Sequence, residues 1–217
     1  MVRKIALVSD FDGTITPEDF FWYVSNQYLD KDSLLPWNEY LAGRETHLNA
    51  LNRIFSHINV PTEDFINFIK TIPYDEFFTQ TAVLCRQKDI PFYICSAGCD
   101  YYINHIIGTE IHNEDINLIT NHGVYHPKSG LVMQAQPKDS PYYDVNVGIS
   151  KSAVVKKLKE DGYFVIFAGD GPPDKEPAKQ ADKVFAKKIL LEYCIRSQKE
   201  YTKLNNFSDI YNYLQEI

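Results

Sequence analysis

The chain has few cysteines, no long apolar run and no excess of basic residues. Its four cysteines among 217 residues lack the spacing of metal ligands. Cys95 and Cys99 are the one pair that a redox or metal site would use, but their apolar surroundings favour reduced packing residues. No apolar run approaches the ~20 residues of a membrane span. These features exclude a disulfide-stapled secreted domain and a membrane-spanning protein.

Composition and charge narrow the class further. The net charge is −7, with Lys and Arg scattered among acids, so we expect no nucleic-acid partner. A chain that is 44% hydrophobic and 24% charged suits a globular α/β core with a small appended unit. The start, Met1-Val2-Arg3-Lys4, leads at once into an apolar run and leaves no room for a signal peptide. We therefore expect a cytoplasmic protein.

Apolar runs alternate with helical patterns along most of the chain, which predicts a parallel sheet covered on both faces. Continuous apolar runs predict buried strands at 5–8, 92–95, 163–167 and 184–186, and short strands near 118–119 and 131–133. Helices are expected over 74–88, through 101–107, over 151–161, up to 181, and twice at the chain end, with an irregular loop over 134–148.

The stretch 17–76 keeps a helical period without the alternation of a strand, and prolines and glycine divide it into several short helices. It reads as an insert between the first strand and the rest of the sheet. We therefore predict two parts, a Rossmann-like core formed by 1–16 and 77–217, and a helical cap formed by 17–76.

Small polar clusters follow three of the predicted strands. In a parallel sheet the carboxyl ends of neighbouring strands meet at one crevice, so these side chains should converge. Several carboxylates brought together need a divalent cation, and oxygen ligands alone favour Mg²⁺. The residues are Asp10 and Asp12 after the first strand, Ser96 after 92–95, Asp170 and Asp174 after 163–167, and Lys151 at the start of a helix.

This arrangement resembles the haloacid dehalogenase-like phosphohydrolase superfamily over essentially the whole chain. The first motif matches at Asp10-Phe11-Asp12-Gly13-Thr14, the second at Ser96, the third at Lys151, and the fourth from Gly169-Asp170-Gly171 to Asp174. Each motif alone has a structural interpretation, such as a cap or a surface lysine, but these do not explain the shared context. Pro172-Pro173 departs from the pattern and makes Asp174 the least certain match.

The resemblance implies a role for each of these residues. Asp10 would attack phosphorus and form an aspartyl-phosphate, while Asp12 would protonate the leaving oxygen and later accept a proton from water. Lys151 and Mg²⁺ would offset the charge repulsion. Mg²⁺ would bind Asp10, Asp170 and the backbone carbonyl of Asp12, with Asp174, Thr14 and Gly171 in support, whereas Ser96, Ala97 and Gly98 would hold the phosphoryl group or substrate.

A helical insert at this place resembles the cap of the phosphoserine phosphatase-like branch, which closes over small metabolites. Within that branch the segments 92–98, 121–122 and 181–187 look most like a methionine-salvage phosphatase of methylthio-ketopentenyl phosphate and like fungal polyol phosphate phosphatases. Asp19 and Arg53 lie where phosphoserine phosphatases bind the ammonium and carboxylate groups. The expected substrate is a small phosphate ester: methylthio-ketopentenyl phosphate, a polyol or sugar phosphate, phosphoserine or a phospho-amino alcohol.

Two other functions remain open on the same residues. One is a regulator that binds a phosphometabolite without turnover, which the intact Asp12 disfavours because binding alone needs no acid or base. The other is a phosphotransferase, which would pass the phosphoryl group to an alcohol in place of water.

Overall fold

The computed structural model describes residues 4–217, and its centre is a mostly parallel seven-stranded sheet in the order β4-β3-β2-β1-β7-β8-β9. Only β4 runs antiparallel to its neighbour. The predicted α/β class is therefore confirmed. Residues Met1–Arg3, for which we expect no signal peptide, lie outside the described residues. The strands are β1 (Ile5–Ser9), β2 (Phe92–Cys99), β3 (Asn117–His126), β4 (Gly130–Gln134), β7 (Phe164–Gly169), β8 (Lys183–Ala186) and β9 (Thr202–Lys203).

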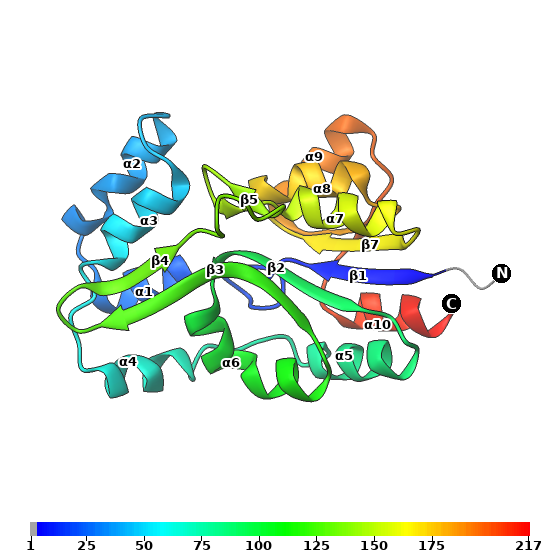
Figure 1. The fold of residues 1–217 in the computed structure, drawn as a ribbon, viewed down its shortest axis with the longest axis horizontal. Helices are drawn as coiled ribbons and strands as arrows, with labels where there is room; N and C mark the ends of the chain where they lie inside the picture. The colour runs from blue at the N-terminus through cyan, green and yellow to red at the C-terminus, as the bar shows by residue number, and fades with distance from the viewer. Residues whose placement is uncertain (1–3) are drawn as a thin grey trace.

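Helices cover both faces of the sheet (Figure 1). On one face lie α5 (Phe78–Gln87), α6 (Asp100–Asn113) and α10 (Ser208–Gln215). On the other lie α7 (Lys151–Glu160), α8 (Lys175–Gln180) and α9 (Lys188–Ser197). In β1, Leu7 packs into the first of these cores, while Ala6 and Val8 pack into the second. Because successive side chains of a strand alternate between faces, a continuous apolar strand needs helices on both sides.

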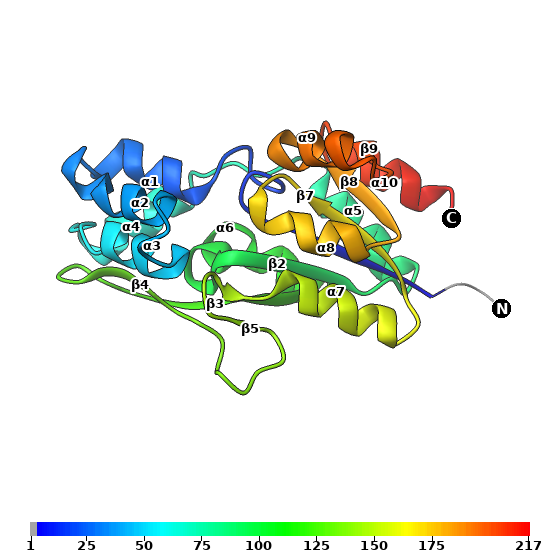
Figure 2. The same cartoon turned by 90° about the horizontal axis from the view of Figure 1, so that it is seen from above.

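The segment 17–76, predicted as a cap and called the cap below, contains α1 (Phe20–Tyr28), α2 (Leu35–Leu41), α3 (His47–Phe55) and α4 (Thr62–Ile69). In Figures 1 and 2 these helices lie beyond the end of the sheet toward which β1 runs. The apolar face of α3, with Leu51, Ile54 and Phe55, is buried, as its periodicity predicts. The cap therefore stands over the carboxyl ends of the parallel strands.

Three groups of hydrogen bonds join the cap to the β3–β4 hairpin and to the loop that follows it. The Asn52 side chain pairs with the backbone of Met133 in both directions, at 2.9 and 2.7 Å. The Tyr125 hydroxyl bonds both backbone groups of Val60, at 3.2 and 2.7 Å. In the third group, Asn146 accepts hydrogen bonds from the first backbone N–H groups of α3. One edge of the cap is thus fixed to the β3–β4 hairpin and to the loop that follows it.

Several element boundaries differ from the sequence prediction. Strand β2 continues to Cys99, with an irregular register against β3, so Ser96 lies within the strand and not after it. Helix α5 begins at Phe78 and not near Tyr74, because Asp75 begins a turn in which its side chain and carbonyl accept hydrogen bonds from the backbone N–H groups of Phe77 and Phe78. The predicted loop 134–148 contains the small hairpin β5 (Tyr143–Asp144) and β6 (Gly148–Ile149), and β9 was not predicted.

All four cysteines are buried and unpaired. Burial raises the pKa of Cys85, Cys95 and Cys99 to about 12, which keeps these thiols protonated and disfavours a redox or metal role for the Cys95/Cys99 pair. Within residues 4–217, no helix has the length and apolar character to cross a bilayer.

Candidate active site

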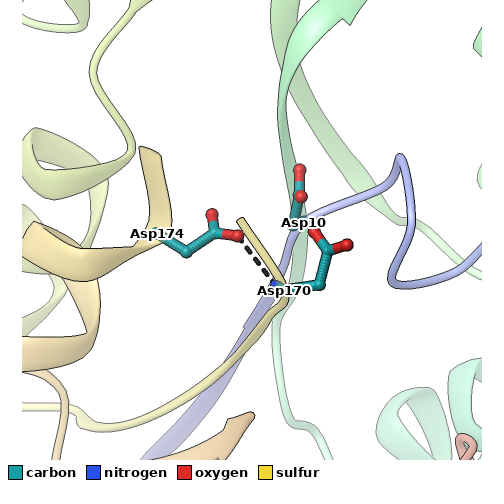
Figure 3. A group of neighbouring side chains, drawn as sticks. All are labelled: Asp10, Asp170 and Asp174. Atoms are coloured by element: carbon teal, nitrogen blue, oxygen red, sulfur yellow. Dashed lines mark hydrogen bonds between the residues drawn. The ribbon is translucent and has the colours of Figure 1, made fainter. Parts of the chain in front are cut away.

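Three buried carboxylates meet where β1 and β7 end. Asp10 directly follows β1, Asp170 directly follows β7, and Asp174 ends the short 3-10 turn Pro172–Asp174. One oxygen from each side chain lies within 4.8 Å of the others, and Figure 3 shows the three side chains around this point. The parallel sheet thus brings together the acids that its topology predicted.

Lys151 supplies the positive charge of this cluster. It is the first residue of α7, a helix whose start is fixed by Ser150, which accepts a hydrogen bond from the backbone N–H of Ala153. Its Nζ lies 2.6 Å from Asp10 Oδ1 and 2.6 Å from Asp174 Oδ1, and only 5% of the residue is exposed. Burial alone would lower the pKa of Lys151, but the two carboxylates outweigh it and raise this pKa. The ammonium therefore stays charged.

Asp174 is held in a way that the two prolines do not disturb. Its Oδ2 accepts hydrogen bonds from the backbone N–H groups of Asp170 and Gly171, both at 2.9 Å. These donors precede Pro172 and Pro173, so the N–H groups that proline lacks are not needed here. Gly169 leaves room for this carboxylate, because a Cβ there would lie 2.6 Å from it. The departure from the motif thus leaves Asp174 in place.

Asp12 sits beside the cluster in a separate hydrogen-bond network. Its Oδ2 accepts hydrogen bonds from the Ser96 hydroxyl at 3.0 Å and from the Tyr102 hydroxyl at 2.5 Å, and its Oδ1 accepts one from the backbone N–H of Phe20 at 3.1 Å. Burial, with the nearby charge of Asp19, raises the pKa of Asp12 to about 6. A carboxyl with such a pKa can both donate and accept a proton near neutral pH.

Tyr102 and Lys188 are site residues that the sequence analysis missed. The Tyr102 ring stacks on Phe20 with the centroids 3.9 Å apart, and a Cβ on Gly98 would lie 1.5 Å from its hydroxyl, so only glycine fits there. Lys188 Nζ lies 3.3 Å from Asp170 Oδ2. Its only sequence indication is its place directly after the segment 181–187.

The carboxylates of Asp10 and Asp170 could hold a divalent cation. Burial and the charge of Asp174 raise the pKa of Asp170 to about 7 and the pKa of Asp10 well above its usual range. Three carboxylates face one buried ammonium, so the cluster carries excess negative charge. Oxygen donors of this kind fit a hard cation such as Mg²⁺, with Asp10 and Asp170 as the available carboxylate ligands.

A cavity of about 410 Å³ joins this site to the cap. Its floor includes Asp10, Asp12, Ser96, Lys151 and Asp170. The cap side is mainly aromatic and aliphatic, and the part of β4 that borders it adds Met133. The cap residues that line it are Asp19, Phe20, Phe21, Trp22, Trp37, Tyr40, Leu41, His47, Leu51 and Phe55.

The remaining predicted site residues divide between this cavity and other places. Asp19, Ala97, Gly98 and Gly171 line it. Thr14 is fully buried outside the lining, and its hydroxyl has no hydrogen-bond partner among residues 4–217. Arg53 is not brought to the cavity: its side chain is 58% exposed and pairs with Glu45 at 2.8 Å.

We expect the metal-free protein to become more stable as the pH falls from 8 to 6.5. Folded Asp170, whose pKa is raised to about 7, takes up a proton in this range, and the raised pKa of Asp10 acts in the same direction, whereas unfolded carboxyls, with pKa values near 4, stay ionised. The gain should be about 1 kcal/mol, or about 2–4 °C in thermal midpoint, measured by calorimetry in EDTA. His47, whose pKa burial lowers to about 4, opposes this gain by about 0.4 kcal/mol at pH 6.5, because the unfolded histidine is half protonated there.

Asp170→Asn is the matched control for this experiment, since it removes one of the two carboxyls and should reduce the gain. Excess Mg²⁺ should do the same in the original protein, because a bound cation keeps the carboxylates ionised. A midpoint that falls between pH 8 and pH 6.5 in EDTA would contradict this account of the cluster.

Phosphatases are among the proteins similar to this chain in sequence and among those similar to it in fold. No protein-family model matches the chain. It is 28% identical over 216 residues to a 2-hydroxy-3-keto-5-methylthiopentenyl-1-phosphate phosphatase of Bacillus cereus (strain ATCC 10987 / NRS 248), covering 99% of this chain and 97% of that protein. It is 25% identical over 211 residues to a protein of the same name from Bacillus pumilus (strain SAFR-032), covering 96% and 90%.

Solved structures give the same fold. A substrate-bound phosphoserine phosphatase matches with a TM-score of 0.70 at 16% identity, over 98% of this chain and 99% of that one. The phosphoserine phosphatase from T. onnurineus matches with a TM-score of 0.66 at 13% identity, over 99% and 96%. The chain therefore has the fold of phosphoserine phosphatases, and its similarity to curated phosphatases extends along its whole length.

Proposed function

We propose that this chain, a phosphatase of the haloacid dehalogenase-like superfamily, hydrolyses small phosphomonoesters through an aspartyl-phosphate on Asp10, with Mg²⁺ as its cofactor. The observation that carries this proposal is the common cavity floor formed by Asp10, Asp12, Ser96, Lys151 and Asp170. A nucleophile, an acid, a cation and metal ligands lie together there, which is the set that phosphoryl transfer needs.

In the first step, a carboxylate oxygen of Asp10 forms a bond to phosphorus while the ester P–O bond breaks. The leaving oxygen takes the proton of Asp12, and an alcohol departs. In the second step, Asp12 accepts a proton from water, whose oxygen attacks the phosphorus and releases phosphate and free Asp10. The hydrogen bonds from Ser96 and Tyr102 hold Asp12 in place for both transfers.

Charge repulsion between Asp10 and the phosphoryl group must be offset in both steps. Lys151, held against Asp10 at 2.6 Å, places a permanent positive charge beside the reacting oxygen. Mg²⁺, held by Asp10, Asp170 and the backbone carbonyl of Asp12, would supply further charge neutralisation and orient the phosphoryl oxygens. Asp174 would orient Lys151 through their 2.6 Å contact.

The cap lining disfavours a leaving group with a negative charge and suits one with an apolar end. None of the cap residues that line the cavity is Lys or Arg, so the carboxylate of phosphoserine would find no cationic partner on the cap. Trp37, Leu51 and Phe55 would instead stabilise an aliphatic or thioether tail by excluding water. A methylthio-ketopentenyl phosphate, for which the curated relatives are named, fits this lining better than a polyol phosphate or an amino-acid phosphate.

A panel of phosphate esters tests this function. We expect purified protein to hydrolyse phenyl phosphate and alkyl phosphates with Mg²⁺, to lose activity in EDTA, and to recover it when Mg²⁺ is restored. The value of kcat/KM for phosphoserine should be at least about 10-fold lower than for a neutral ester of similar size, since an unpaired desolvated charge costs more than 1 kcal/mol.

Three outcomes would contradict the proposal. Tight binding of esters without any phosphate release would indicate a regulator, and transfer to added glycerol in preference to water would indicate a phosphotransferase. Full activity after complete removal of divalent cations would exclude Mg²⁺ as the cofactor.

A further inference from the structure

His47 stands on the cap wall of the cavity, opposite the phosphate-binding floor proposed above. It is the first residue of α3 and is half-buried. Its ring packs edge-on against Trp37 and Tyr40, with centroids 5.7 and 5.2 Å apart and interplanar angles of 68° and 74°. It is therefore a hydrogen-bonding group placed within an otherwise mainly aromatic wall.

One nitrogen of the His47 imidazole has no hydrogen-bond partner among the described residues. Its Nδ1 is buried and has no hydrogen bond to any residue in 4–217. Buried polar atoms in folded proteins are nearly always paired, and leaving one unpaired is costly. The other ring nitrogen, Nε2, is not enclosed in this way. Because His47 lines the cavity, a molecule bound there can form a hydrogen bond with this nitrogen.

The backbone of His47 is fixed to the core and not only to the cap. Asn146, from the turn between β5 and β6, accepts hydrogen bonds from the His47 backbone N–H with its side chain at 2.9 Å and from the Leu48 N–H with its carbonyl at 3.0 Å. Asp144 holds Asn146 in turn, by accepting its N–H at 2.8 Å. These bonds fix the imidazole relative to the phosphate-binding floor of the cavity. A residue that distinguishes one leaving group from another needs such a fixed position.

The charge state limits what His47 can bind. Burial and the nearby ammonium of Lys151 lower the pKa of His47 to about 4, so the ring is neutral at physiological pH. A neutral imidazole offers one N–H donor and one acceptor. It suits a carbonyl or hydroxyl group and gives no charge attraction to a carboxylate.

We propose that His47 is a specificity-determining residue that hydrogen-bonds an uncharged carbonyl or hydroxyl group of the leaving alcohol while the aromatic wall encloses its apolar end. The inference rests on the proposed phosphomonoesterase function and deepens it. It assigns a role to a residue that lies outside all four sequence motifs, and it describes the substrate as an oxygenated alkyl phosphate with a hydrophobic tail.

Matched esters and matched variants test this role. The probes are n-pentyl phosphate and pentyl phosphates with a ketone at carbon 2, 3 or 4, with phenyl phosphate as a general substrate. The variants are His47→Phe, which keeps the aromatic packing, His47→Gln, which restores a hydrogen-bonding group, and His57→Phe, which alters an exposed histidine just after α3. Thermal midpoints check folding, and His47→Phe should not lower the midpoint because it removes an unpaired polar atom.

We expect one keto ester to exceed n-pentyl phosphate by about 10-fold in kcat/KM with the original protein, the value of one good neutral hydrogen bond. His47→Phe should reduce this preference to within about 2-fold, mainly by raising KM for the keto ester. His47→Gln should restore part of the preference, and His57→Phe should keep all of it.

Several results would overturn the inference. They are equal rates for all pentyl esters, a preference that survives His47→Phe, or an equal loss on keto and plain esters, which would show a merely structural role. Hydrolysis of phenyl phosphate without hydrolysis of any pentyl ester would defeat this inference alone. Hydrolysis of none of the probes would defeat the proposed function as well.

Discussion

Replacing Asp10 with Asn should abolish turnover of every phosphate ester, with kcat falling by about 10⁴-fold or more, because an amide cannot form the acyl-phosphate bond. The variant should stay folded. Lys151 keeps its 2.6 Å contact to Asp174, and one of the mutually repelling buried carboxylates is removed. Phosphate release from phenyl phosphate under single-turnover conditions is the measurement.

A second readout separates chemistry from binding in this variant. The original protein, mixed with an activated aryl ester that makes the first step fast and quenched in acid, should carry phosphate on Asp10, detectable as a mass increase of one peptide, and Asp10→Asn should carry none. Asp19→Asn is the matched control, since Asp19 also lines the cavity and its replacement leaves Asp10 in place to carry the phosphate. Near-normal turnover by Asp10→Asn would exclude the covalent mechanism.

Replacing Lys151 with Met should have the largest effect on stability, a loss of about 3–5 kcal/mol in the free energy of unfolding of the metal-free protein. The buried ammonium joins Asp10 and Asp174 at 2.6 Å, so its removal leaves two desolvated carboxylates without a counter-charge. Protonation can relieve them, so the loss should be smaller at pH 5.5 than at pH 8. Urea unfolding at both pH values measures this difference, and turnover should fall at the same time.

Lys157→Met provides the control on the same helix. Lys157 pairs with Asp161 at the surface, where both side chains are more than a third exposed, so its loss should leave stability nearly unchanged. Equal effects of the two substitutions, or a larger loss for Lys151→Met at pH 5.5 than at pH 8, would contradict the electrostatic account of the cluster.

The parts of the site that the sequence predicted are those placed by the sheet itself. Asp10 and Asp170 each follow a continuous apolar strand, and parallel pairing of β1 with β7 aligns Ser9 with Ala168, which brings these acids side by side. Lys151 begins the helix that precedes β7 and contacts Asp10. Local pattern and topology were enough, because no long-range side-chain packing had to be known.

Residues that depend on tertiary packing were not predictable in this way. Tyr102 occurs in an apolar helical run that reads as core, and only the fold shows its hydroxyl meeting Asp12. His47 has no motif around it and reaches the cavity because the cap folds back over the sheet. Arg53 shows the opposite case: it lies two residues from Leu51 on α3, away from the buried apolar stripe, and so points to solvent.

The anchoring of the cap limits how substrate preference can be transplanted between phosphatases of this architecture. If residues 17–76 of this chain alone were grafted onto another phosphatase, their partners Met133, Tyr125 and Asn146 would be left behind, because these lie in the β3–β6 region. The grafted helices would lose the contacts that hold them in register, and the imidazole of His47 would lose its position. Cap and hairpins therefore form one exchangeable unit, and chimeras or evolutionary changes in selectivity must carry 17–76 and 117–149 together.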